Sequence, residues 1–357
     1  MRIIDLNDDQ SGLEAFLVID HELFPVSAGG TRMLPDVDVR EIARLARAMT
    51  WKFAALRVPY AGAKSGIRFD GGDRAAVLAA YKRALEPYRG VFVPGPDMGT
   101  FPADFFDDRG GPLPLLARTH DGLGMDDLAT GHGIKGAAEA ALAHLGRSLK
   151  GAAVAVEGFG KVGAGTARAC VRAGARLVGV STLDGLVADP EGLDVEELLA
   201  LRERYGDRFV EHGSHPLRRR EELFELECDL LVPGARPDSI TVAVAERLSC
   251  AVIAPAANIP YGPGALEVLH RREIVAVPDF LSNAGAVYLY DIVAQDGEPA
   301  AALATIEAEV GVSVARTLIA SSELGITPME AALRDARVYL AEATGARGAL
   351  LDELIPV

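Results

Sequence analysis

The segment Gly158-Phe159-Gly160-Lys161-Val162-Gly163 decides the fold, because the pattern GxGxxG has a defined structural setting. The apolar run 152–156 precedes it, helical composition continues over 164–173, and a second apolar run follows at 176–181. This order of strand, glycine turn, helix and strand is typical of a dinucleotide-binding unit, in which the glycines let a pyrophosphate approach the helix N-terminus. We therefore predict that all six residues of the segment bind a dinucleotide.

The end of the second apolar run should contact the adenosine ribose of that cofactor. The run ends at Thr182, with Asp184 two residues later, where dinucleotide-binding units commonly carry an acidic residue. No arginine follows immediately to hold a 2′-phosphate. The sequence therefore favours NAD, with NADP possible.

The remainder of the chain supports an α/β fold with two domains. Short apolar runs at 228–232, 251–254 and 274–277 alternate with helical stretches, which predicts a parallel, doubly wound sheet. A chain of 357 residues is long enough for a second domain. Its predicted elements are strands at 13–19 and 91–93 and helices at 37–55 and 74–88.

Glycines guide three further expectations. The pair Gly29-Gly30 predicts a turn, and Gly62 and Gly66 leave Lys64 open to close approach by backbone or substrate. A helix is expected to open at Thr130-Gly131-His132-Gly133. Two more helices are predicted near 299–322 and 328–343.

Composition excludes several classes of function. The net charge of −15 argues against nucleic acid or an anionic membrane surface as a partner. The three cysteines, Cys170, Cys228 and Cys250, lack the spacing of a metal or redox site. The N-terminal residues lack the apolar core of a signal peptide, and no apolar run reaches membrane-spanning length. We expect a cytoplasmic protein without a metal site.

Several motifs together resemble a known family, the glutamate/leucine/phenylalanine/valine dehydrogenases, over nearly the whole chain. The length is most similar to the shorter leucine, phenylalanine and valine enzymes. The motifs are Gly29-Gly30-Thr31-Arg32-Met33, Met49-Thr50-Trp51-Lys52, Gly62-Ala63-Lys64, Pro96-Asp97-Met98-Gly99-Thr100, the segment 158–163, and Pro278-Asp279-Phe280-Leu281-Ser282-Asn283-Ala284-Gly285.

The resemblance implies reversible oxidative deamination of an L-amino acid to a 2-oxo acid and ammonia with a nicotinamide cofactor. It also implies a substrate-binding and oligomerisation domain over 1–128, on which 325–357 pack through a returning C-terminal helix. A Rossmann domain would cover 129–324, and the protein would be a homo-oligomer.

The resemblance also assigns roles to single residues. Lys64 and Asp97 resemble the catalytic lysine and the proton-transfer carboxylate, and Lys52 resembles the lysine that holds the substrate carboxylate. The remaining substrate contacts would be Gly29, Gly30, Asn283, Val287 and Tyr290. Beyond 158–163, Thr182 and Asp184, cofactor contacts would include Thr130, Ala257 and Asn258.

Two departures from the family pattern bear on the substrate. Glutamate enzymes of this family carry a lysine directly before the glycine pair and a serine seven residues beyond the matching asparagine, whereas this chain has Ala28 and Tyr290. A second substrate carboxylate would be left unpaired, at a cost of several kcal/mol. The pattern favours an apolar or aromatic amino acid. The alternatives are a glutamate dehydrogenase with an altered pocket and a non-catalytic nicotinamide-binding paralogue.

Overall fold

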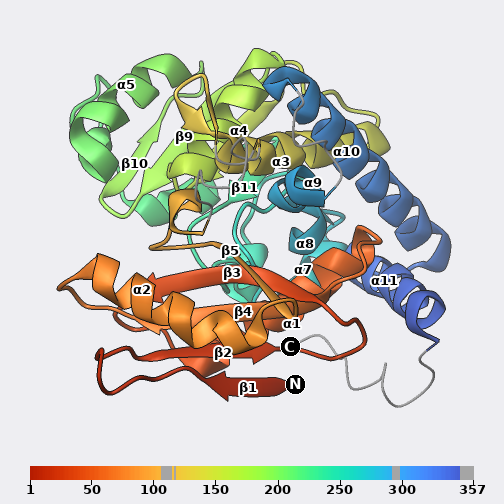
Figure 1. Cartoon of the computed structure of the whole chain (residues 1–357). Coiled ribbons are helices and arrows are strands. Elements are labelled where there is room, and N and C mark those ends of the chain that lie inside the picture. The colour runs from red at the N-terminus through yellow and green to blue at the C-terminus, as the bar shows by residue number, and fades with distance from the viewer. Residues whose placement is uncertain (106–114, 116–117, 292–297, 346–357) are drawn as a thin grey trace. The chain divides into compact units, whose positions relative to one another are not determined.

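The computed structural model describes residues 1–105, 115, 118–291 and 298–345. Its backbone divides into two units, Met1–Leu113 with Leu333–Val357, and Pro114–Ala332. Each unit is built on its own sheet (Figure 1). The expected α/β class is confirmed. The separate roles expected for the two domains stay predictions.

The first unit contains a mixed sheet in the order β1-β2-β4-β3-β5. β1 and β2 pair antiparallel, as do β2 and β4, whereas β3 runs parallel to both β4 and β5. The strands are β1 (Arg2–Asp5), β2 (Ala15–Ile19), β3 (Ser27–Leu34), β4 (Ala61–Arg68) and β5 (Phe92–Pro96). Its helical segments are α1 (Val39–Ala55), α2 (Arg74–Leu85), the 3₁₀ turns η1 (Glu86–Tyr88) and η2 (Pro102–Asp104), and the second half of α11 (Pro328–Thr344).

One expectation about the first unit is wrong, and one of its strands was not predicted. Gly29 and Gly30 lie inside β3 rather than in a turn, and Lys64 lies on β4, a strand that the sequence did not predict. β4 reads Ala-Gly-Ala-Lys-Ser-Gly-Ile-Arg, which is poor in β-branched and aromatic residues. It is a strand because β2 and β3 supply hydrogen-bond partners on both sides.

Helix α1 is docked closely on β4. Asp38 caps its N-terminus by accepting hydrogen bonds from the amides of Arg40 and Glu41. A Cβ atom at Gly62 would lie 2.2 Å from the backbone nitrogen of Thr50, so only glycine permits this contact. Gly62 was expected to leave Lys64 open to close approach. The space beside Gly62 is instead filled by the backbone of α1.

The second half of α11 packs within the first unit. Tyr339 stacks on Phe24 with ring centroids 6.5 Å apart, and Asp335 pairs with Arg57 at 3.1 Å. These contacts agree with the expected return of the C-terminal helix to the first domain.

The second unit contains a six-stranded sheet in the order β10-β9-β8-β11-β12-β13. All neighbours are parallel except β10, an antiparallel edge strand that the sequence did not predict. The strands are β8 (Ala153–Glu157), β9 (Arg176–Thr182), β10 (Gly185–Ala188), β11 (Leu230–Pro233), β12 (Val252–Ile253) and β13 (Val275–Ala276). Because the strand order reverses at β8, the carboxyl ends of β8 and β11 form the usual ligand position of a Rossmann sheet.

Helices and short turns complete the second unit. A small hairpin, β6 (Thr119–His120) with β7 (Leu123–Gly124), precedes α3. The helical segments are α3 (Met125–His144), α4 (Lys161–Arg172), α5 (Val195–Tyr205), η5 (Gly206–Glu211), η6 (Arg220–Glu225), α6 (Val242–Ala245), α7 (Ala265–Arg271), α8 (Asp279–Ser282), α9 (Gly285–Asp291) and α10 (Pro299–Leu324). Among the described residues, no helix combines the length and apolarity needed to cross a membrane.

The expected start of α3 is wrong. The helix begins at Met125, so Thr130-Gly131-His132-Gly133 lies inside it. Its glycines serve packing: α10 runs alongside α3 (Figure 1), and a Cβ atom at Gly136 would lie 2.3 Å from the carbonyl oxygen of Glu307 in α10.

Replacing Gly136 with alanine separates helix propensity from packing. Propensity alone favours alanine by ~1 kcal/mol, whereas overpacking against a backbone atom costs roughly 1–3 kcal/mol. We expect the packing cost to outweigh the gain in propensity, so Gly136→Ala should lower the free energy of unfolding by up to about 2 kcal/mol, measured by urea denaturation. Gly213→Ala is the control, since its Cβ atom would lie 3.6 Å from the Leu201 side chain. A stabilised Gly136→Ala protein would contradict the packing account.

Candidate active site

A partly buried cluster of charges in the first unit joins the two predicted catalytic residues. The Nζ atom of Lys64 lies 2.7 Å from Oδ2 of Asp97, and Nε of Arg32 donates to the same oxygen at 3.2 Å. Arg32 also pairs with Glu41 of α1 at 2.6 Å. The side chains of Lys64 and Arg32 are only 6% and 7% exposed, so these ion pairs are largely shielded from water.

The cluster keeps Asp97 ionised. Burial opposes its ionisation, but the neighbouring cations Lys64 and Arg32, together with hydrogen bonds from Lys64 and the Met98 amide, lower the pKa of Asp97 to about 2. At neutral pH the site therefore presents a carboxylate held by two cations.

Gly30 makes room for this ion pair. A Cβ atom on Gly30 would lie 2.8 Å from Nζ of Lys64 and 2.9 Å from Cβ of Asp97. Gly29 has a different reason to be glycine, because its Cβ atom would lie 1.7 Å from the carbonyl oxygen of Ala63. Gly30 borders the charged pair, and Gly29 permits β3 to approach β4.

The turn after β5 fixes Asp97. Thr100 accepts a hydrogen bond from the Asp97 amide at 2.9 Å and donates one to the Thr31 carbonyl at 2.7 Å. Gly99 has φ +78°, and a Cβ atom there would lie 2.0 Å from the Met33 carbonyl. The turn thus ties Asp97 to β3.

Lys52 comes from the helix that covers the same strand. It lies in the last turn of α1 and is 7% exposed. Because α1 packs on β4, the strand that carries Lys64, the two predicted lysines come from adjoining elements of one unit.

The predicted cofactor turn has the geometry of a phosphate cradle. Gly158 has φ +83°, and Gly160 caps α4 with open space where a Cβ atom would stand. A Cβ atom at Gly163 would lie 1.9 Å from the Gly158 carbonyl, so the first turn of α4 packs tightly against the glycine turn that follows β8. Lys161 and Val162 lie in that turn, and Phe159 is buried against Phe209.

The two residues predicted to contact the ribose lie at the end of β9 and just beyond it. Thr182 ends β9 and is buried, while Asp184 is exposed and donates its amide to Oγ1 of Thr182 at 3.1 Å. The three arginines 218–220 lie beside this turn. With residues 183–185 they line a hollow of about 460 Å³.

Asn258 follows β12, Asn283 follows β13, and the two side chains are hydrogen-bonded. The Nδ2 atom of Asn283 donates to Oδ1 of Asn258 at 3.0 Å and to the carbonyl oxygen of Ala257 at 3.1 Å. The structure therefore joins three of the predicted site residues in one hydrogen-bonded group.

The remaining predicted residues lie on helices of the second unit. Thr130 lies inside α3 and donates to the Asp126 carbonyl at 3.0 Å. Val287 lies on α9 and is half-buried. The Tyr290 side chain lies outside the described residues.

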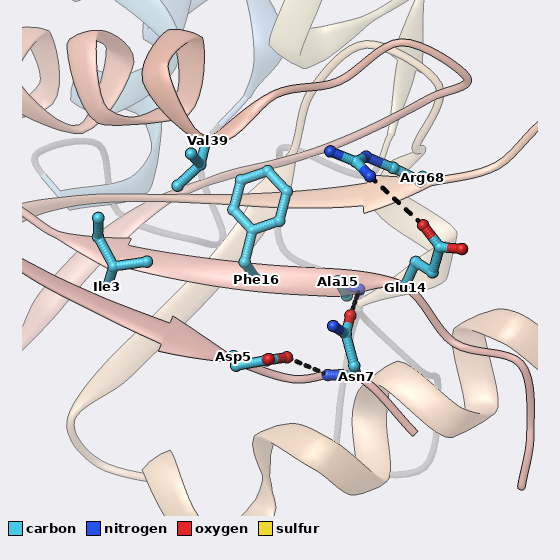
Figure 2. A pocket seen from close by; sticks show the side chains of 8 residues that line it. All are labelled: Ile3, Asp5, Asn7, Glu14, Ala15, Phe16, Val39 and Arg68. Atoms are coloured by element: carbon cyan, nitrogen blue, oxygen red, sulfur yellow. Dashed lines mark hydrogen bonds and ion pairs between the residues drawn. The ribbon is translucent and has the colours of Figure 1, made fainter. Parts of the chain in front are cut away.

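A hollow elsewhere in the first unit contains none of these residues. It encloses about 280 Å³ beside β1 and β2, and an ion pair of 3.5 Å joins Arg68 to Glu14 on its wall (Figure 2). Within the described part of the chain, no group of three or more potential ligand residues is placed to hold a metal ion.

Sequence reasoning gave no role to three charged residues near these sites. Arg32 and Glu41 complete the charge cluster of Asp97. The strand alternation that places Arg32 on the face of Gly30 was the available signal.

The third residue, Asp127, lies in the second unit. Burial and the neighbouring Asp126 raise the pKa of Asp127 to about 7, and Lys161 lies 3.9 Å from its carboxylate.

Acid unfolding tests the Asp97 cluster. A folded-state pKa of about 2, against an ordinary 3.8, corresponds to about 2 kcal/mol of stability. Since the folded value is the lower one, this contribution is present above about pH 4 and is lost as the pH falls towards 2. Urea unfolding at a series of pH values should show the stability gap between wild type and Asp97→Asn narrowing through this window. A constant gap would contradict the assignment.

Comparison with known proteins places these features in a family. Glutamate dehydrogenase A2 of Halobacterium salinarum is 34% identical over 277 residues, covering 72% of this chain and 66% of that protein. The glutamate dehydrogenase of Thermotoga maritima is 35% identical, covering 72% and 67%. The NAD-specific glutamate dehydrogenase of Staphylococcus aureus is 33% identical, covering 72% and 66%. The chain thus aligns with about two thirds of the length of these relatives.

Solved structures share the fold. Hetero-hexameric glutamate dehydrogenase from Thermus thermophilus, in a leucine-bound form, superposes with a TM-score of 0.81 at 28% identity, covering 98% of this chain and 90% of that one. L-tryptophan dehydrogenase from Nostoc punctiforme has a TM-score of 0.68 at 23% identity, covering 97% of both chains, and shows likeness of fold alone.

Family profiles match both units of the chain. The dimerisation domain of the Glu/Leu/Phe/Val dehydrogenases matches residues 2–105, and the glutamate/leucine/phenylalanine/valine dehydrogenase profile matches residues 122–294. The chain belongs to the glutamate/leucine/phenylalanine/valine dehydrogenase family of oxidoreductases.

Proposed function

We propose that this chain catalyses the reversible oxidative deamination of an L-amino acid to its 2-oxo acid and ammonia with a nicotinamide cofactor. The observation that carries the proposal is the buried pair of Lys64 and Asp97 at 2.7 Å beside Gly30. A lysine and an ionised carboxylate held in contact are a proton donor and acceptor, as deamination requires.

Four charged residues of the candidate site in the first unit have distinct roles in this proposal. Lys52 holds the substrate α-carboxylate as a point cation. Asp97, ionised at neutral pH, accepts a hydrogen bond from the substrate ammonium group and orients it. Lys64 binds the water that adds to the substrate Cα, from which ammonia then leaves. Arg32 balances the charge of Asp97 during these proton transfers.

The second unit fits a dinucleotide. Its glycine turn leaves open space at Gly160, at the N-terminus of α4, where backbone amides and the helix dipole favour a pyrophosphate. A bound nicotinamide supplies the acceptor for the hydride that leaves the substrate Cα. Asn258 and Thr130 would contact the nicotinamide ribose or amide, and Asn283 would meet both the substrate and the cofactor.

An apolar or aromatic amino acid is the proposed substrate class. Ala28 shares the face of β3 with Gly30 and Arg32, is 9% exposed, and offers no group to a second carboxylate. A substrate side-chain carboxylate there would lose its water without gaining a partner. Val287 supplies apolar surface on α9.

Glutamate is the second candidate, and the names of the relatives favour it. The proteins from Halobacterium, Thermotoga and Staphylococcus are all glutamate dehydrogenases. Glutamate enzymes of the family carry a lysine at the position of Ala28. The two candidates differ in whether another residue of this chain supplies a cation in its place.

A panel of 2-oxo acids separates these candidates. We expect reductive amination of 2-oxoisocaproate, 2-oxoisovalerate, phenylpyruvate or indolepyruvate with ammonium, and weak turnover of 2-oxoglutarate. Lys64→Ala and Asp97→Ala should each lower kcat at least a hundredfold, as loss of a general acid or base does. Turnover of 2-oxoglutarate alone would overturn the apolar assignment. Cofactor binding without any turnover would favour a non-catalytic paralogue.

NAD is the proposed cofactor, as in the Staphylococcus relative that is named NAD-specific. Asp184 offers a carboxylate to a ribose 2′-hydroxyl and would repel a 2′-phosphate. The arginines beside it already hold carboxylates: Arg218 and Arg219 pair with Glu222 at 2.8 and 3.2 Å, and Arg220 pairs with Glu221 at 2.9 Å. A 2′-phosphate would have to displace these acids.

Charge substitutions at this turn test the cofactor preference. Asp184→Ala should lower kcat/KM for NADH roughly tenfold, the value of one hydrogen bond to a charged group, and narrow its advantage over NADPH. Arg219→Ala should change neither value appreciably, because its side chain is 78% exposed and paired. A selective loss of NADPH activity in Arg219→Ala would instead show that the arginines bind a 2′-phosphate.

We also propose that the first unit mediates assembly into a homo-oligomer. The profile that matches residues 2–105 describes a dimerisation domain, and the Thermus neighbour is hetero-hexameric.

A further inference from the structure

Ile259 has a backbone conformation that its side chain disfavours. Its φ is +52°, in the left-handed region, and it follows Asn258 directly. A β-branched residue crowds its own backbone there, so such a conformation persists only where surrounding contacts enforce it.

Hydrogen bonds enforce it from both sides of the residue. Oδ2 of Asp279 accepts the Ile259 amide at 2.8 Å, and the amide of Asp238 donates to the Ile259 carbonyl at 2.8 Å. Asp279 is 5% exposed, and an aspartate so deeply buried is rarely found without a structural or functional reason.

Asp279 is also connected to the second asparagine of the site. It is the first residue of α8, and its carbonyl accepts the Asn283 amide at 2.9 Å. The side chain of Asn283 then donates to Asn258 at 3.0 Å. The connections form a closed ring: Asp279 to Ile259, along the chain to Asn258, across to Asn283, and back through α8.

We propose that Asp279 is a positioning residue that holds Asn258 and Asn283 in the geometry that binds the nicotinamide end of the cofactor. It acts through the backbone of Ile259 and touches no reacting atom. This inference rests on the proposed function for the role of the two asparagines. The strain at Ile259 makes the arrangement dependent on Asp279, because without this acceptor the peptide before Ile259 relaxes towards negative φ and moves Asn258.

The test is a double-mutant cycle between Asp279 and Ile259. Asp279→Ala should raise the Kd for NADH, measured by fluorescence titration, and lower kcat/KM by roughly tenfold to a hundredfold, since misplaced positioning groups have effects of this size. In an Ile259→Gly background the same substitution should cost several times less, because glycine adopts positive φ without strain.

Two comparisons separate positioning from general damage to the fold. Asp279→Asn keeps an oxygen that accepts the Ile259 amide, and it should retain NADH affinity near that of the wild type. Ser282→Ala is the matched control on α8: Ser282 is fully buried and its hydroxyl has no hydrogen-bond partner among the described residues, so its removal should leave cofactor affinity unchanged.

Amide hydrogen exchange at Ile259 supplies a readout independent of turnover. Exchange should accelerate in Asp279→Ala and stay slow in Asp279→Asn. Unchanged exchange and NADH affinity in Asp279→Ala, or an equal loss in both Ile259 backgrounds, would overturn the proposal. If Asp279→Ala does not fold, the Asp279→Ala/Ile259→Gly protein, which lacks the strain, carries the same test. If the wild type binds NADH without turnover, the proposed function is refuted. The positioning role of Asp279 can still be tested by the binding and exchange measurements.

Discussion

The carboxylate of Asp97 between Lys64 and Arg32 is the interaction on which the first unit depends. Buried charges are tolerated only when they are paired, and here two cations meet two carboxylates, since Glu41 completes the set. The partners come from three strands and one helix: Arg32 from β3, Lys64 from β4, Asp97 from the end of β5 and Glu41 from α1. The register of the sheet, the docking of α1 and the absence of a side chain at Gly30 are therefore all needed to bring these four charged groups together.

The sequence predicted what depends on local pattern. The glycine segment 158–163, its flanking strand and its helix have strong short-range signals, and the structure shows them as β8 and α4. Helices α1 and α10 were likewise visible from composition and apolar spacing. Their identity depends little on distant parts of the chain.

Elements that depend on distant partners escaped prediction. β4 has a glycine-rich sequence with low strand propensity and exists because β2 and β3 enclose it. The glycines of β3 and of α3 looked like a turn and a helix start, yet Gly29 and Gly131 lie where another backbone comes too close for a side chain, and Gly30 lies against the side chains of Lys64 and Asp97. The same limit applies to the site. Lys64 and Asp97 were visible as residues, but Arg32 and Glu41 acquire their part only through the register of β3 and the docking of α1. The role of Asp279 depends on a backbone angle at Ile259 that composition does not reveal.

The interrupted course of the first unit also has a consequence for biosynthesis. Its sheet is encoded before residue 114, but the segment beginning at Leu333 that completes it follows the whole of Pro114–Ala332. A ribosome therefore releases the strands that carry Lys64 and Asp97 long before Asp335 and Tyr339 exist to pack against Arg57 and Phe24. The continuous second unit can therefore fold once residue 332 has emerged, whereas the first unit is complete only after the segment from Leu333 has been made.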